Sequence, residues 1–120
     1  MIYLTIALLS SLYGVDSDLA IKLAKIESNF NPKAMSKTKD GGLFQLNTRY
    51  HKFHNPNWIF DIEINSHRAM KTLANLKTKC NLKFKNHFVL CYNMGTRGAS
   101  KLKNPNNQTY IKKLTSVWKN

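Results

Sequence analysis

The sequence is poor in the residues that interrupt or cross-link a chain: its 120 residues include five glycines, three prolines and two cysteines. It has no internal repeat and no low-complexity segment. These absences exclude collagen-like, solenoid and disordered chains. No apolar run reaches the roughly eighteen residues that a membrane-spanning helix needs. The 42% hydrophobic content instead predicts one folded domain over residues 1–120.

Acidic residues are also scarce, since six Asp and Glu stand against nineteen Lys and Arg and the net charge is +13. Such a charge favours anionic partners: nucleic acid, acidic lipid or bacterial wall polymer. Arg, the usual reader of bases, occurs only as Arg49, Arg68 and Arg97. The other basic residues are Lys spread along the chain, which suits an anionic wall surface and predicts no specific nucleic acid. A non-catalytic, basic polyanion-binding module is the alternative.

The first nine residues are apolar and have the length of a signal-peptide core, but no Lys or Arg precedes them. The same stretch shows helical spacing, and Gly14 stands where a helix would end. The residues in helical register are Ile2, Ile6, Leu9 and Tyr13. We therefore expect an integral first helix rather than a cleaved signal.

The remaining pattern predicts a mostly α-helical domain with almost no strand alternation. Further helices are expected at about 16–28, 61–79, 86–94 and 107–118, with Asp16 or Ser17 and then Asp61 as N-caps. A turn of helix is expected near Leu43. Residues 33–42 are predicted to form a polar loop that could contain a short hairpin, and residues 55–57 to interrupt the helical pattern.

One acidic residue lies on the apolar face of the helix expected at 16–28. The positions that share this face are Ala20, Leu23, Ala24 and Glu27. The carboxyl group of Glu27 should therefore face the protein interior or a cleft, where burial raises the pKa of a carboxyl group. A carboxylic acid that is still protonated near neutral pH suits general-acid cleavage of a glycosidic bond. The alternative is a structural role, with Glu27 turned to solvent or paired with a lysine.

Two segments, ESNFNPKAMS at 27–36 and GLFQL at 42–46, resemble the signature of the soluble lytic transglycosylase (SLT) domain family. Further blocks are similar to that family and occur in its order: YGVD at 13–16, the segment 61–73 with Asn65 and Ala69, YNMG at 92–95 and QTYI at 108–111. The resemblance covers about residues 8–118. It implies a mostly α, lysozyme-like domain, related to goose-type lysozyme, with a substrate cleft.

The resemblance also implies a peptidoglycan lytic transglycosylase. Glu27 would protonate the bond between N-acetylmuramic acid (MurNAc) and N-acetylglucosamine (GlcNAc), and would then act as the base that forms 1,6-anhydroMurNAc. The substrate is the peptidoglycan glycan strand, and no second carboxylate, cofactor or metal is needed. The substrate-binding candidates are Ser28, Gln45, Tyr92, Asn93 and Tyr110.

Departures from the family pattern leave a second outcome open. Phe44 replaces the commoner Met and Met94 replaces Ala, while KDGG at 39–42 departs from the usual loop. QLNTRY at 45–50 is similar to a segment of animal C-type lysozymes. A lysozyme-type hydrolase would use a second carboxylate. Its candidates are Asp40, Asp61 and Glu63, for which the ordinary interpretations are a turn residue, an N-cap and a first-turn surface acid.

The two cysteines, Cys80 and Cys91, flank a turn between expected helices, so a disulfide is geometrically possible. We expect free thiols, because nothing in the sequence guarantees export to an oxidising compartment. His51 and His54 share an i, i+3 spacing, but no recognised zinc spacing is present, and no metal site is expected.

We expect a monomer that acts on the bacterial cell wall, either in phage lysis or entry or in bacterial wall remodelling. Delivery without a signal peptide would depend on a holin or on the phage particle. The lysines are the visible source of affinity for the wall.

Overall fold

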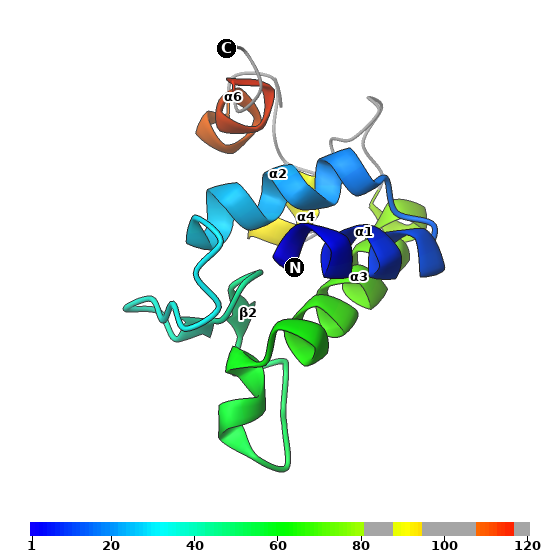
Figure 1. Cartoon of the computed structure of the whole chain (residues 1–120). Helices are drawn as coiled ribbons and strands as arrows, with labels where there is room; N and C mark the ends of the chain where they lie inside the picture. The colour runs from blue at the N-terminus through cyan, green and yellow to red at the C-terminus, as the bar shows by residue number, and fades with distance from the viewer. Residues whose placement is uncertain (81–87, 95–107, 117–120) are drawn as a thin grey trace. The chain divides into compact units, whose positions relative to one another are not determined.

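The computed structural model describes residues 1–80, 88–94 and 108–116. The chain divides into two compact units, Met1–Met70 and Lys71–Asn120, and each is described by itself. The described elements are α1 (Ile2–Leu12), α2 (Ser17–Ser28), β1 (Asp40–Gly41), β2 (Leu46–Asn47), the 3-10 helix η1 (Pro56–Phe60), α3 (Ile62–Lys79), α4 (Val89–Met94) and α6 (Thr109–Ser116) (Figure 1). This mostly helical content confirms the predicted fold class. A single catalytic domain stays a prediction.

Helix α1 packs against α2 through a buried apolar side and through two hydrogen-bond contacts of the Ser17 hydroxyl, with Ser10 and with the Ala7 carbonyl. Ile6 and Ser10 are fully buried on the inner face of α1, and the Ser10 hydroxyl lies 2.8 Å from the Ser17 hydroxyl. Gly14 turns the chain between the helices with a φ of +70°, which glycine adopts without strain. The predicted first helix is therefore present.

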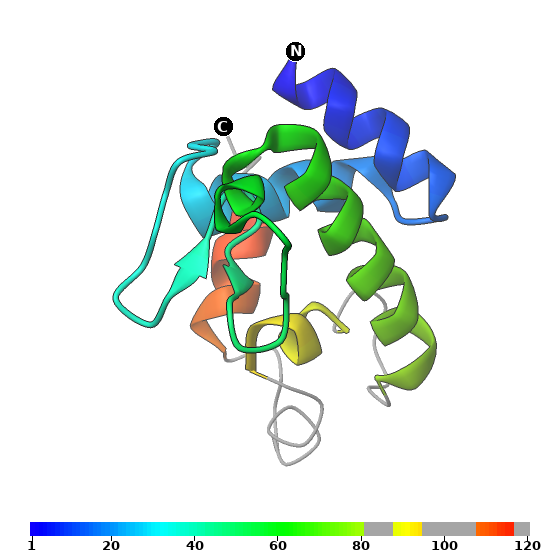
Figure 2. The same cartoon turned by 90° about the horizontal axis from the view of Figure 1, so that it is seen from below.

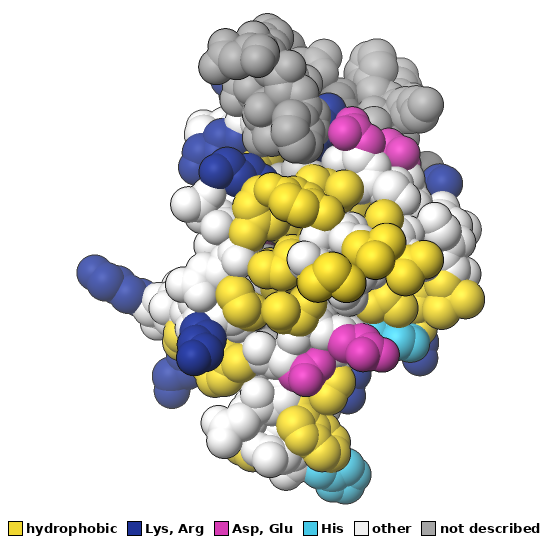
Figure 3. All heavy atoms as spheres, viewed as in Figure 1, with side chains coloured by type: hydrophobic (Ala, Val, Ile, Leu, Met, Phe, Trp, Pro, Cys, Tyr) yellow, Lys and Arg dark blue, Asp and Glu magenta, His cyan; other side chains and the backbone are white. Residues whose placement is uncertain are grey.

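The outer face of α1 is apolar and exposed. Leu4, Leu8 and Leu12 recur every four residues and are 51%, 63% and 69% exposed. Figure 3 shows a broad hydrophobic area on this side of the molecule. No helix in the described part of the chain is long and apolar enough to cross a membrane.

Helix α2 ends in an unusual pair of residues. Asn29 and Phe30 both have positive φ, 52° and 61°, and their N–H groups donate to the carbonyls of Lys25 and Ala24. This is the left-handed ending that satisfies the last carbonyl groups of a helix. It turns the chain sharply out of the helix axis and into the hairpin that follows (Figures 1 and 2).

The hairpin pairs β1 with β2 in antiparallel register, with Asp40 opposite Asn47 and Gly41 opposite Leu46. The expected turn of helix near Leu43 is wrong. Gly42 and Gln45 have φ values of +80° and 52°, which no right-handed helix contains, and the Gln45 N–H closes a tight turn onto the Gly42 carbonyl. The apolar Leu43 is fully buried as part of this turn.

The break predicted at residues 55–57 contains the start of η1. The Asn55 side chain accepts a hydrogen bond from the Asn57 N–H, and Pro56 occupies the first turn of the helix. These are the residues that begin a short helix as readily as they interrupt a long one. Helix α3 begins two residues after η1 ends. The Asp61 carboxylate accepts from the Ile64 N–H at 2.8 Å, which confirms Asp61 as the N-cap.

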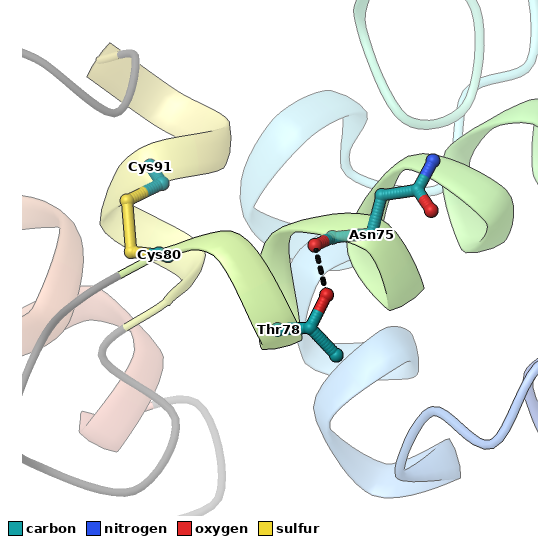
Figure 4. Close-up of a disulfide and its surroundings, with 4 residues drawn as sticks. All are labelled: Asn75, Thr78, Cys80 and Cys91. Carbon is teal, nitrogen blue, oxygen red and sulfur yellow. Dashed lines mark hydrogen bonds between the residues drawn. A yellow bond between two sulfur atoms is a disulfide. The ribbon is translucent and has the colours of Figure 1, made fainter.

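In the second unit, Cys80 and Cys91 form a disulfide with a Cα–Cα distance of 6.2 Å (Figure 4). The expectation of free thiols is therefore wrong. Cys80 follows the end of α3, where its N–H donates to the Leu76 carbonyl, and Cys91 is buried in α4. Together these positions bring the two Cα atoms within bonding range.

Helix α4 has only six residues and contacts α6, whose inner face buries Tyr110, Ile111 and Leu114. Both helices fall inside the ranges expected from the sequence. The expected ends at residues 86–87, 107 and 117–118 lie outside the described residues, as do the loop after Met94 and Arg97.

Removing the disulfide should destabilise the protein. A bridge with a sequence separation of eleven closes a short loop and restricts the unfolded chain, so the double variant Cys80→Ser/Cys91→Ser should lose about 2–3 kcal/mol of unfolding free energy. The measurement is urea unfolding with and without dithiothreitol. Reductant should lower the midpoint of the wild type and leave that of the double variant unchanged. Equal midpoints for all four samples would contradict the bridge.

Candidate active site

Glu27 lies in the last turn of α2, at the edge of the buried core. Leu23 and Ala24, on the same helix face, are fully buried, and Glu27 itself is partly buried. The sequence placed its carboxyl group in the interior or a cleft, and the observed position is intermediate between burial and exposure.

The next residue, Ser28, joins α2 to the hairpin. Its hydroxyl lies 2.7 Å from the Leu43 carbonyl oxygen and 3.2 Å from the Ala24 carbonyl oxygen. The shorter contact links the end of the helix to the turn between β1 and β2. Ser28 therefore holds the turn close to Glu27, the residue that precedes Ser28 in the chain. A contact between Ser28 and substrate stays a prediction.

The same turn is held from the other side by Asn65 of α3, which is fully buried. Its side-chain nitrogen donates to the Gly41 carbonyl at 3.0 Å and to the Ile59 carbonyl at 2.8 Å, and its side-chain oxygen accepts from the Phe44 N–H at 2.9 Å. One amide thus satisfies three buried backbone groups, which would otherwise be costly to leave unpaired.

Only glycine fits beside this amide. A Cβ atom added to Gly42 would lie 2.2 Å from the Asn65 side-chain nitrogen and 2.2 Å from the Ile59 carbonyl oxygen. The positive φ of Gly42 adds a second reason for glycine. The sequence pattern did not reveal the role of Asn65. The sequence feature that could have revealed it is the position of Asn65, a polar residue one helical turn before Ala69 on the apolar side of a long helix.

Gln45 uses its side-chain nitrogen to hold the backbone of the turn. The nitrogen donates to the Gly42 carbonyl at 3.0 Å and to the Ala34 carbonyl at 3.3 Å. Among the described residues, none donates to its side-chain oxygen, which leaves an acceptor for another molecule. Ser28 and Gln45 are thus brought to the same turn, as the site interpretation requires.

The acidic candidates for a second carboxylate occupy other positions in the structure. The Asp40 carboxylate accepts hydrogen bonds from Thr38, Asn47 and Ser36 inside the hairpin, at 2.7, 2.8 and 3.3 Å. Asp61 caps α3, and Glu63 is exposed in its first turn. Each therefore has the ordinary role that the sequence suggested, although Asp40 is held by hydrogen bonds rather than simply solvated.

The other candidates belong to the second unit. Tyr92 is partly buried on α4, Asn93 is exposed beside it, and Tyr110 is 9% exposed on α6. Because α4 contacts α6, these side chains come from one pair of packed helices. Their role in substrate binding stays a prediction.

The chain after β2 contains a histidine whose pKa is lowered. Burial of His51 and the positive charge of Arg68 both lower it below 6.5. The Arg68 guanidinium donates to the Lys52 carbonyl at 3.0 Å and lies 4.3 Å from the centre of the Phe53 ring. His54 is exposed. No group of three potential metal ligands occurs among residues 1–80, 88–94 and 108–116.

A comparison with protein families matches residues 6–115 to the transglycosylase SLT domain. The chain belongs to this family. Neither the search among curated proteins nor that among solved structures found a match. As a transglycosylase SLT domain, the chain has a lysozyme-like helical fold, acts on the cell wall and is of the lytic transglycosylase type that binds peptidoglycan.

The match includes the helix that carries Glu27, the hairpin and the start of α3. All the residues that hold the turn between β1 and β2 therefore lie within the matched part of this SLT domain.

Replacing Asn65 should destabilise the SLT domain strongly. Asn65→Ala removes three hydrogen bonds and leaves buried backbone groups unpaired, which should cost about 3 kcal/mol of unfolding free energy. Urea unfolding measures this loss. Asn75→Ala, at an exposed position of the same helix, is the matched control and should change stability by less than about 0.5 kcal/mol. Similar losses for the two variants would show that the amide does not hold the turn.

Stability should also fall in mild acid because of His51. Its folded pKa is lowered relative to 6.5, so the unfolded chain binds a proton more readily and stability decreases as the pH falls through about 6.5. His51→Gln should therefore show a smaller change in melting temperature between about pH 7.5 and 5.5 than the wild type. His54→Gln, at an exposed position, should keep the wild-type slope. The interpretation fails if His51→Gln keeps that slope too.

Proposed function

We propose that this SLT domain is a peptidoglycan lytic transglycosylase that cleaves the MurNAc-β-1,4-GlcNAc bond with Glu27 as its catalytic acid and then base. The observation that carries the proposal is the partly buried carboxyl group of Glu27 at the end of α2, next to the residue that holds the turn. The family match and the motif at 27–36 support it.

In the first step the Glu27 carboxylic acid donates its proton to the glycosidic oxygen, and the bond between that oxygen and C1 of MurNAc breaks. The GlcNAc end leaves as an alcohol, and positive charge develops at C1. This step requires Glu27 to start in its acid form.

In the second step the Glu27 carboxylate accepts the proton of the MurNAc 6-hydroxyl group while that oxygen bonds to C1. This closes the 1,6-anhydro ring and returns Glu27 to its acid form. Water is not consumed, so no second carboxylate has to bind or activate a water molecule. The engagement of Asp40 and Asp61 in structural hydrogen bonds is consistent with this one-carboxylate mechanism.

We assign substrate contacts within each unit separately, to polar groups around the turn in the first unit and on α4 in the second. The free acceptor oxygen of Gln45 suits the N–H of an acetamido group. Tyr92 and Asn93 have accessible surface on α4, and Ser28 acts beside the acid. Tyr110 of α6, which is 9% exposed, is the remaining substrate-binding candidate.

The setting that we propose is a monomeric wall-degrading enzyme of phage lysis or entry, or of bacterial wall remodelling. The net charge of +13 attracts the enzyme as a whole toward the anionic wall. A lysozyme-type hydrolase remains the competing chemistry on the same bond, and its products differ from those of a transglycosylase.

Glu27→Gln should abolish product release from purified peptidoglycan. The amide cannot supply the proton, so we expect a loss of about a thousandfold in rate. The measurement is mass spectrometry of the soluble products before and after borohydride reduction. Glu63→Gln, the same exchange at an exposed position, is the control and should keep wild-type activity.

The chemistry of the product ends decides between the two enzymes. Wild-type products with 1,6-anhydroMurNAc ends resist reduction and support the transglycosylase. Muramic acid ends that borohydride reduces would overturn it in favour of a hydrolase. A wild type that releases no product, or an active Glu27→Gln variant, would refute the assignment of Glu27.

A further inference from the structure

The positive charge of the first unit is concentrated on one stretch of chain. Five of the eight Lys and Arg residues of Met1–Met70 lie between positions 33 and 52, and all five are exposed. The five residues, here called the basic hairpin, are Lys33, Lys37, Lys39, Arg49 and Lys52. The first 21 residues, by contrast, contain no Lys or Arg at all.

The backbone gathers part of this charge at one end of the hairpin. Lys37 and Lys39 lie in the tight turn that the Lys39 N–H closes onto the Ser36 carbonyl. The Lys39 carbonyl in turn accepts from the Thr48 N–H at 3.2 Å, which places the residue before Arg49 beside Lys39. Figure 3 shows Lys and Arg side chains projecting from the side of the molecule on which Figure 1 draws this hairpin.

These charges are not neutralised within the described part of the chain. The acidic residue of this stretch, Asp40, accepts hydrogen bonds from Ser36, Thr38 and Asn47 and forms no ion pair with the basic hairpin. Lys22 forms an ion pair with Asp18, but both residues belong to α2. Like charges at one tip repel one another, and an anionic partner would relieve that repulsion.

The basic hairpin is continuous with the candidate active site. It begins five residues after α2 ends and includes the turn that Ser28 and Gln45 hold. The Gln45 side chain also donates to the Ala34 carbonyl, next to Lys33. Glu27 and Gln45 therefore flank, along the chain, the segment that carries Lys33, Lys37 and Lys39, so a polymer held at both residues would have the basic hairpin nearby.

The chemistry of peptidoglycan indicates which of its groups would be bound. The sugars of the glycan strand carry no charge, whereas the attached peptide stems carry carboxylates. Four of the five residues are Lys, a mobile point charge that suits carboxylates on flexible peptides. A phosphate-specific surface would favour the planar, bidentate fork of Arg.

We propose that the basic hairpin binds the carboxylates of the peptide stems of peptidoglycan, and so makes stem-bearing strands the preferred substrate. The inference rests on the proposed function, because it assumes that the strand is held at Glu27.

The test compares two forms of one insoluble substrate. Purified peptidoglycan, stripped of attached phosphate polymers, is used as it is or after its carboxylates have been amidated with carbodiimide and excess ammonium. Lys37→Gln/Lys39→Gln removes two charges from the basic hairpin. Lys71→Gln/Lys79→Gln removes two exposed charges from α3 and is the matched control. Circular dichroism checks that both variants are folded, and co-sedimentation at low salt measures binding.

The hairpin variant should bind native peptidoglycan about fivefold more weakly than the wild type, because each exposed ion pair contributes only a few tenths of a kcal/mol to about 1 kcal/mol. On amidated peptidoglycan the two proteins should bind equally. The control should match the wild type on both substrates. With soluble strands, KM should rise by the same factor and kcat should stay unchanged.

Three results would overturn the proposal: equal binding of the hairpin variant and the wild type to native peptidoglycan, an equal loss on amidated material, and an equal loss in the control. A loss that appears only when phosphate polymers are left on the wall would assign the hairpin to phosphodiesters instead. Because sedimentation needs no turnover, these outcomes are separate from the product analysis that tests Glu27.

Discussion

The arrangement of the candidate site depends on a single buried amide. Asn65 pairs with three backbone groups from three segments of the first unit, those of Gly41, Phe44 and Ile59. A backbone that reverses direction inside a core needs such partners, because its own N–H and C=O groups are no longer paired in a regular helix or sheet. The amide can approach this closely because residue 42 has no side chain. The tight turn, its glycine and its asparagine therefore form one unit.

The catalytic candidate depends on this unit through its neighbour. Ser28 donates to the Leu43 carbonyl, so the turn held by Asn65 also receives the end of α2. Positive φ values at Asn29, Phe30, Lys39 and Gln45 all fall between the end of α2 and the start of β2. Non-glycine residues adopt this conformation at some cost, and it persists only where surrounding contacts impose it. These non-glycine residues with strained backbone conformations therefore all lie in the segment next to the candidate site.

Helical periodicity predicted the parts of the fold that are regular. The bounds of α2 and α3 agree with the sequence to within a residue, because Asp16 and Asp61 occupy the N-cap positions and the apolar spacing is long. The turn at Leu43 was mistaken for helix because its conformation is set by Asn65, twenty-one or more positions away, and no local pattern records that contact. The disulfide was not predicted for a different reason. The spacing of the two cysteines allowed it, but the sequence does not reveal whether the protein folds in an oxidising compartment.

Scarcity of acid links the composition to the proposed chemistry. The chain has six acidic residues, and in the described structure most have a structural position: Asp16 at the N-cap of α2, Asp18 paired with Lys22, Asp40 in the hairpin, Asp61 at the N-cap of α3. Glu63 is exposed in the first turn of α3, where the helix dipole favours a negative charge. A mechanism with two carboxylates would have to draw its second group from these five residues, four of which hold a cap, hairpin or ion-pair position. A mechanism that uses the carboxyl group of Glu27 twice needs no second acidic residue. The anions available to the basic hairpin are then the carboxylates of the bound peptidoglycan strand.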